Sequence, residues 1–180
     1  MKSFKFKNGT YKGQVNINNL PHGKGELVEE KIEKNRSVSG KELKKKITKI
    51  YSGNWTKGKM SGKGKLKIDT HEDYLDCVDI YSGNWKNNFL EGFGKYLQYI
   101  DGIFETKYEG NFKKNKYNGK GTTFFRGYSK FDPELNKQIG NFKNGNLEGE
   151  AIYVDSLFEN EDYVIVKELL EKLKSNKKLE

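Results

Sequence analysis

Large apolar residues alternate with polar residues or glycine in five places along the chain. Residues 51–55 read Tyr-Ser-Gly-Asn-Trp, and the same pattern recurs at 81–85 and, as Tyr-Glu-Gly-Asn-Phe, at 108–112. The copy at 138–142 has lost its first aromatic residue, and 11–15 is a degenerate first copy. Side chains alternate between the two faces of a strand, so positions one, three and five share a face. The pattern therefore predicts strands that place two rings and a gap on one face.

Further glycines follow each copy at a fixed spacing. Nine residues after Gly53 comes Gly62, and Gly64 stands two residues further on; the later copies keep this spacing. The distances between copies vary, which predicts constant hairpins joined by loops or extended hairpin tips. We expect Gly62 and Gly64 to share one face of the returning strand, where the smooth glycine backbone leaves room for a ring of the next repeat. The residues that define the repeat are Tyr11, Gly13, Tyr51, Gly53, Trp55, Gly62, Gly64, Tyr81, Gly83, Trp85, Gly92, Gly94, Tyr108, Gly110, Phe112, Gly119, Gly121, Gly140, Phe142 and Gly149.

Turn signals support hairpins inside and between the repeats. Each full copy carries Gly or Asn at the second position of its turn, as at Gly58 and Asn88, and these residues tolerate a positive φ. An apolar residue follows two positions later, as at Met60 and Leu90, and we expect it to cover the hairpin end of the core. Asp-Gly at 101–102 lies between two strand-like segments, which indicates a hairpin between repeats.

These patterns predict an all-β fold, an elongated single-layer antiparallel sheet of about five hairpin repeats at 1–154. Glycine disappears after Asp155, and the segment 155–180 has an apolar stripe at helical spacing. We expect a C-terminal α-helix there, which either caps the last hairpin or binds a partner. The residues assigned to its contact face are Val166, Leu169, Leu170 and Leu173.

The repeated Tyr-x-Gly-x-Trp and Gly-x-Gly resemble the MORN (membrane occupation and recognition nexus) repeat over about residues 11–153. Two departures, Val15 in the first copy and Gln138 in the last, fall in terminal repeats, which are commonly atypical. The resemblance implies a MORN-type solenoid that acts as a non-catalytic platform. Such repeats occur in axonemes and other cytoskeletal assemblies, at membrane junctions, and attached to lipid kinases and methyltransferases. It leaves open whether protein or lipid is bound.

Composition and charge narrow the classes of protein. The chain has 20 Gly, 11 Tyr, 11 Phe and a single cysteine, Cys77, so an intrachain disulfide scaffold is excluded and a reducing compartment, the cytoplasm, is expected. The first residues show no apolar segment typical of a signal peptide, and the sequence predicts no transmembrane helix. The net charge is +9, and the segment 31–49 alone carries +6.

The segment 31–49 has two interpretations. It is either a basic finger that contacts anionic lipid, nucleic acid or an acidic protein, or a solvated edge strand whose lysines prevent aggregation. Lysines occur throughout the chain and no aromatic residues are interleaved with this run, which favours the solvated edge strand and argues against nucleic acid as a partner. The residues assigned to an anionic-partner contact are Lys41, Lys44, Lys45, Lys46 and Lys49.

The inventory of reactive residues argues against an enzyme. The only two histidines, His22 and His71, have no patterned partners for a catalytic triad. The acidic segment 69–76 lacks the spacing and internal glycine of a calcium loop, and Gly-Lys-Gly-Lys at 62–65 lacks the full phosphate-loop pattern. The sequence thus predicts no catalytic residue, cofactor, metal or small-molecule substrate.

The predicted function is a protein–protein interaction module or scaffold-like assembly subunit of a cytoskeletal, axonemal or other large complex. The alternative is a peripheral membrane module that binds anionic lipid through the basic connector at 31–49.

Overall fold

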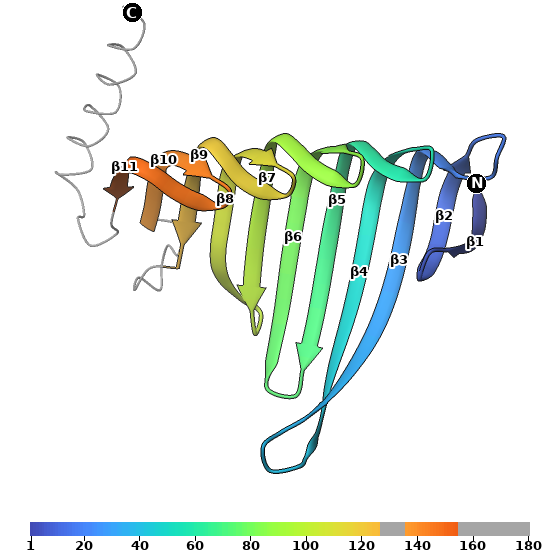
Figure 1. The fold of residues 1–180 in the computed structure, drawn as a ribbon, viewed down its shortest axis with the longest axis horizontal. Coiled ribbons are helices and arrows are strands. Elements are labelled where there is room, and N and C mark those ends of the chain that lie inside the picture. The colour runs from blue at the N-terminus through green and yellow to red at the C-terminus, as the bar shows by residue number, and fades with distance from the viewer. Residues whose placement is uncertain (127–135, 155–180) are drawn as a thin grey trace, which may run out of the picture.

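The computed structural model describes residues 1–126 and 136–154, which form one open antiparallel sheet. In Figure 1 each strand lies beside the preceding one in a single elongated layer, which confirms the expected architecture. The expected helix at 155–180 lies outside the described residues. The strands are β1 (Lys2–Phe6), β2 (Gly9–Val15), β3 (Pro21–Arg36), β4 (Glu42–Thr56), β5 (Lys59–Glu72), β6 (Leu75–Lys86), β7 (Phe89–Ile100), β8 (Ile103–Lys113), β9 (Lys116–Phe125), β10 (Asn136–Lys143) and β11 (Asn146–Val154).

The two sides of the sheet differ in how the strands are joined. The tight turns of the repeats lie along one side, and the connectors of variable length become extended strands that project from the other side (Figure 1). The β3–β4 hairpin is the longest, and its pairing continues to Arg36 opposite Glu42. Asp101 and Gly102 form the expected turn between β7 and β8. Within the described residues, the variable connectors are therefore part of the sheet.

The tight turns have the predicted backbone conformation. Both central residues of the turn at 57–58 have positive φ, 50° and 77°, and the turns at 87–88, 114–115 and 144–145 do the same. This is what a type I′ turn requires. The turns are also linked in series, because the Asn88 N–H donates to the Met60 carbonyl at 3.1 Å and the Asn115 N–H to the Leu90 carbonyl at 3.2 Å.

A row of glycines crosses the sheet from β2 to β10 and provides space for rings. A Cβ on Gly64 would fall on the ring of Tyr51, and a Cβ on Gly121 would fall on Tyr108. Both rings therefore come from the same hairpin as the glycine, whereas the sequence pattern suggested a ring from the next repeat. The aligned residues are Gly13, Gly25, Gly53, Gly64, Gly83, Gly94, Gly110, Gly121 and Gly140.

The other repeat glycine of each returning strand has a different role. Gly62 has a φ of 69° and lies where the pairing of β4 with β5 shifts register between Gly53 and Trp55. Its nearest neighbours belong to Asn54, on the side of the sheet away from the rings. The expectation that Gly62 and Gly64 share one smooth face is therefore wrong. Gly62 supplies the left-handed backbone conformation of a bulge, and residues other than glycine rarely adopt that conformation.

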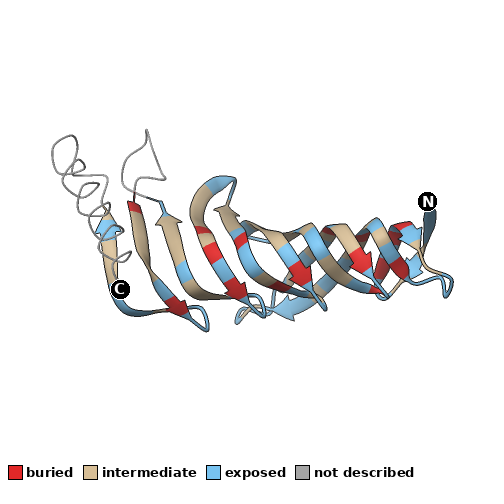
Figure 2. Cartoon of the chain, turned by 90° about the horizontal axis from the view of Figure 1, so that it is seen from above, coloured by how far each residue is buried: buried red, intermediate tan, exposed pale blue. Residues whose placement is uncertain are grey.

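Aromatic rings form most of the core, which follows the tight-turn side of the sheet. Figure 2 shows the buried positions recurring from strand to strand near these turns. Leu90 is fully buried and Met60 is partly buried, so the apolar residues that follow the turns do cover this end of the core. The buried core residues are Tyr11, Leu27, Tyr51, Trp55, Trp85, Leu90, Tyr108, Phe112 and Phe142.

Candidate interaction surfaces

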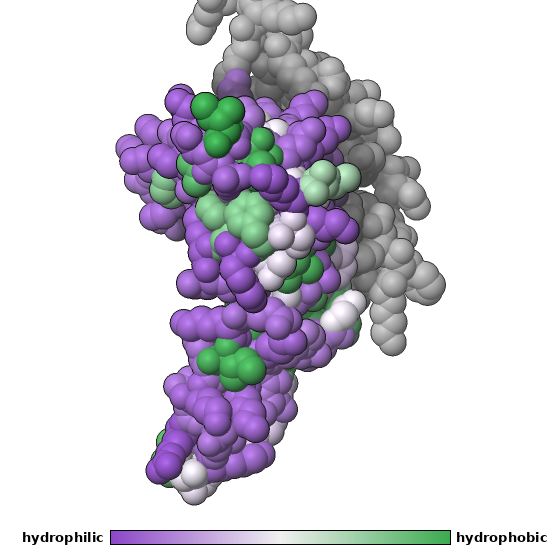
Figure 3. Space-filling model, turned by 90° about the vertical axis from the view of Figure 1, so that its right-hand side faces the viewer, coloured by the Kyte–Doolittle hydropathy of each residue, from purple (hydrophilic) through white to green (hydrophobic). Residues whose placement is uncertain are grey.

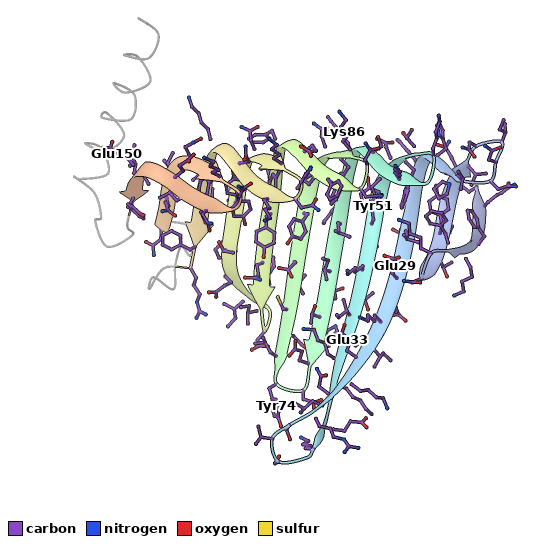
Figure 4. All side chains as sticks on the ribbon, in the orientation of Figure 1. Glu29, Glu33, Tyr51, Tyr74, Lys86 and Glu150 are labelled. Carbon is purple, nitrogen blue, oxygen red and sulfur yellow. The ribbon has the colours of Figure 1, made fainter. Side chains whose placement is uncertain are left out.

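The sheet has two chemically different faces, which strand alternation assigns to alternate residues. We call the face that carries Tyr51, Gly53 and the other motif rings the ring face. The residues between them, such as Ser52, point to the opposite face, which we call the lysine face because Lys63 and Lys65 on β5 also project from it. Figure 4 shows side chains on both sides of the layer, with Tyr51 near the tight turns and Tyr74 near the far hairpin ends.

On the ring face, the motif aromatics of the second repeat pack against each other and against both neighbouring repeats. The Tyr51 and Trp55 rings meet edge to face at 5.1 Å, and Tyr51 meets Trp85 in the same way at 5.3 Å. The Tyr51 hydroxyl donates to the Asn54 carbonyl at 3.1 Å, and the Trp55 indole N–H donates to the carbonyl of Gly25 at 3.1 Å. These rings are buried structural residues.

The third repeat departs from this arrangement although its pentapeptide is identical. The Tyr81 ring is half-buried and lies against Tyr96, with 4.7 Å between the ring centroids. The Tyr96 hydroxyl donates to Asp79 at 2.7 Å. The side chain of Leu90 lies at the space above Gly83 that Tyr51 fills in the second repeat. The ring face therefore has a polar, tyrosine-rich patch at its centre.

The basic connector, predicted as an anionic-partner contact, lies on β3, β4 and the turn between them. Strand alternation divides its lysines, with Lys45 and Lys49 on the ring face and Lys44 and Lys46 on the lysine face. Ion pairs occupy some of them: Lys45 lies 2.6 Å from Glu72, and Lys46 lies 3.1 Å from Glu30. The run of charge in the sequence is therefore not one basic patch on the surface. Its role in binding an anionic partner stays a prediction.

The tip of this hairpin contacts the next hairpin. The Lys41 ammonium donates to the Tyr74 hydroxyl at 3.2 Å and lies 5.3 Å from the centre of the Tyr74 ring. The Tyr74 side chain is exposed. Lys41 is thus positioned by a neighbour, while its charge remains accessible to solvent.

Two tyrosines and the cysteine in and beside the ring core are held in their neutral forms by raised pKa values. Burial raises the pKa of Tyr81 to about 12, with a further contribution from the Asp79 carboxylate, and burial raises the pKa of Tyr108 to about 12. Burial, followed by the charge of Asp79, also raises the pKa of the Cys77 thiol. A thiol with a raised pKa is a poor nucleophile at neutral pH. The acidic segment 69–76 contains a direct contact between His71 and Asp76 at 2.9 Å.

The residues matched by a family description coincide with the hairpins of the sheet. The MORN repeat model matches residues 11–28, 51–70, 81–99, 108–129 and 139–156, which is more than half of the chain. The chain belongs to the MORN repeat family. No curated protein sequence matches it significantly. Each matched segment begins within the first strand of a tight-turn hairpin, so each MORN unit contains one tight turn of the sheet.

Two kinds of feature were not found in the described part of the MORN sheet. Within residues 1–126 and 136–154, no helix is long and apolar enough to cross a membrane, and no group of acidic, His or Cys side chains is placed to hold a metal ion. The proposed helix contacts, Val166, Leu169, Leu170 and Leu173, lie outside the described residues. At the N-terminal end of the sheet, Figure 3 shows a largely hydrophilic surface with separate small apolar patches.

A basic surface on the MORN motif itself was missed by the sequence interpretation. Lys24, Lys63 and Lys120 each lie between two glycines, in Gly-Lys-Gly triplets of three repeats. The second glycine of each triplet lies on the ring face, and neighbouring residues of a strand point to opposite faces. The lysine before it therefore points to the lysine face. The triplet itself contained this signal, but counting charge over long segments hid it.

Proposed function

We propose that this MORN chain is a non-catalytic protein–protein interaction module or assembly subunit of a cytoskeletal, axonemal or other large complex in the cytoplasm. The observation that carries the proposal is the division of labour between the faces. Most of the motif rings are buried in the core, which leaves a long polar lysine face and extended hairpins for contacts. MORN repeats are generally involved in protein–protein or membrane-lipid interactions, which fits a module of this kind.

The arrangement of the basic connector favours protein over lipid. Basic residues bind an anionic membrane surface best when they project in one direction, because the electrostatic attraction falls off within a Debye length, ~10 Å. Lys44 and Lys45 project from opposite faces, and Lys45 and Lys46 have acidic neighbours. We therefore expect the connector to contribute little to binding anionic lipid.

Native purification tests the proposal. An affinity-tagged chain, expressed in its own cells and isolated without detergent, should bring down protein neighbours at near-stoichiometric levels by mass spectrometry. Cells that express the tag alone are the control and should yield none of these proteins. Recovery of membranes without any reproducible protein would contradict the proposal.

Flotation with vesicles containing phosphatidylserine addresses the lipid alternative directly. The triple variant K44E/K45E/K46E should change flotation little compared with the unaltered chain. A large loss of flotation, confined to low salt, would instead identify the connector as a lipid contact.

A further inference from the structure

The identical pentapeptides at 51–55 and 81–85 contain two residues that the ring core does not use. Tyr51, Gly53 and Trp55 belong to the ring face, but Ser52 and Asn54 point to the lysine face. Register places Asn54 opposite Lys24 on β3, and Ser52 opposite Lys65 on β5. The repeated motif therefore alternates short polar residues on one strand with lysines on its neighbours.

These residues build a furrow that follows β4 on the lysine face. Its floor is the segment 52–54, and its walls come from β3, with Lys24 and Glu26, and from β5, with Lys63 and Lys65. Lys12 on β2 extends the first wall, and the hollow has a volume of about 690 Å³. The walls stand two strand spacings apart, roughly 10 Å, which is wide enough for one extended chain.

The furrow is strongly basic. The side chains of Lys12, Lys24, Lys63 and Lys65 are exposed, and none of them forms an ion pair with any residue of 1–126 or 136–154. Glu26 is the single acidic residue among the described residues that line it. In the connector, by contrast, Lys45 and Lys46 have acidic partners. The four furrow lysines are therefore unpaired within the described residues, whereas Lys45 and Lys46 of the connector are not.

We propose that the furrow along β4 binds an acidic polypeptide segment in extended conformation. The inference rests on the proposed function and names the chemistry of one partner. Lys63 and Lys65 are two residues apart on one strand, so their spacing of about 6.6 Å equals that of carboxylates at alternate positions of an extended peptide. The Ser52 hydroxyl and the Asn54 side chain on the floor supply hydrogen-bonding groups for the peptide.

Other anionic macromolecules fit the furrow less well. Single-stranded nucleic acid is usually held by aromatic stacking as well as charge, and none of the described residues that line the furrow is aromatic. A flat bilayer surface would meet the lysine tips but leave the Ser52 and Asn54 floor unused. An extended chain uses both the walls and the floor.

The next repeat offers a natural comparison within the same sheet. Ser82 on β6 lies opposite Lys65 and Lys95, but Lys95 is engaged by Glu109 at 2.7 Å. The corresponding position between the two wall glycines is Phe93 rather than lysine. The β6 furrow is thus less basic, and the binding segment should prefer β4.

Fluorescence anisotropy with a labelled peptide of alternating Glu and Ser provides the test. At ~50 mM salt, where screening is weak, K24E/K63E/K65E should reduce the affinity about ten-fold or more. The control K34E/K44E/K46E changes the net charge equally and on the same face, outside the furrow, and should reduce it about two-fold at most. The neutral variant K24Q/K63Q/K65Q should give an intermediate loss. Tryptophan emission from the buried Trp55 and Trp85 confirms that each variant is folded.

Three results would overturn the inference: no peptide binding by the unaltered chain, equal losses in the furrow and control variants, or equal affinity for a peptide of the same composition with all Glu residues together. Poly-uridylate and phosphatidylserine vesicles are run in parallel, and binding of either one through the furrow in place of the peptide also contradicts it. If native purification recovers protein partners that the furrow variant retains, the proposed function stands and only the furrow assignment fails.

Discussion

The second and third repeats contain the same five residues, Tyr-Ser-Gly-Asn-Trp, yet they use the tyrosine differently. Tyr51 is buried over Gly64 and donates to the Asn54 carbonyl, whereas Tyr81 is half-buried against Tyr96 near Asp79. In the third repeat Leu90 lies at Gly83 and Phe112 lies at Gly94. In the second repeat Tyr51 covers both equivalent glycines. A motif therefore fixes the hairpin, while residues outside the motif decide which side chain fills the gap.

The largest expected effect comes from removing the Leu90 side chain, which lies over Gly83 in place of the tyrosine of the third repeat. Leu90→Ala should destabilise the protein by about 3 kcal/mol, because a fully buried side chain leaves a cavity that Tyr81 does not occupy. Met60→Ala, at the corresponding position of the second repeat, should cost about 1 kcal/mol, since Met60 is partly exposed. Urea unfolding measures both. Equal losses would mean that the two repeats pack alike.

A smaller effect is expected from adding a methyl group under the Tyr51 ring in the second repeat. Gly64→Ala places a methyl group on the Tyr51 ring and should cost about 2 kcal/mol. Gly92→Ala is the control, because its φ is 71° and nothing lies near its Cβ, so only the backbone strain of about 1 kcal/mol remains. A less harmful change at Gly64 than at Gly92 would show that the ring readily moves aside.

Removing a hydroxyl distinguishes the two tyrosines directly. Tyr51→Phe deletes the hydrogen bond to Asn54 and should cost about 1 kcal/mol. Tyr81→Phe should change the free energy of unfolding by no more than about 0.5 kcal/mol, because its ring is already partly in water. If both variants behave alike in urea titrations, the difference in burial has no energetic meaning.

The pH dependence gives the smallest effect. The pKa of Tyr81 in the folded protein is raised to about 12, above the ordinary value of about 10. Its contribution to stability is therefore complete below about pH 10 and is lost as the pH rises towards 12. Asp79→Asn removes one cause of that shift, so it should lose less stability over this range.

Urea midpoints from pH 9 to pH 12 test this last prediction. The control is Tyr51→Phe, which lacks a tyrosine whose pKa burial also raises but keeps Asp79. The effect of Tyr51→Phe on the pH dependence of stability should be the same whether or not Asp79→Asn is also present. Asp79 also contributes to the raised pKa of Tyr96 and Tyr117, so an unchanged alkaline profile for Asp79→Asn would separate Asp79 from the titration of all three tyrosines.

Much of the sheet could be predicted because the repeat encodes it locally. Turn residues such as Gly58 and Asn88 require positive φ wherever they occur, and alternation places Tyr51 and Trp55 on one face. The role of Gly62 was misassigned because a glycine at a bulge and a glycine under a ring look the same in a sequence. The position of Tyr81 depends on Leu90 and Tyr96, which lie outside the repeated motif.

The interaction surface was harder to predict than the fold, because it depends on which charges are paired. The connector has the densest run of lysines, but the sheet separates Lys44 from Lys45 and pairs Lys46 with Glu30. Lys24 and Lys63 stand alone between glycines in the sequence, and the register brings them to opposite walls of one furrow. Counting charge along the sequence does not show which lysines lie close together on neighbouring strands, so the furrow could not be predicted in that way.

The bonds between successive turns give the chain a direction of growth. Gly58 donates its N–H to the Pro21 carbonyl, Asn88 donates to Met60, and Gly145 donates to Tyr117, so each new turn finds its acceptor on the repeat before it. The indole groups of Trp55 and Trp85 also reach back to Gly25 and Gly64. A ribosome releases the acceptors first. Each hairpin can therefore dock on a finished template as it emerges, and the order of synthesis is also the order in which the sheet can close.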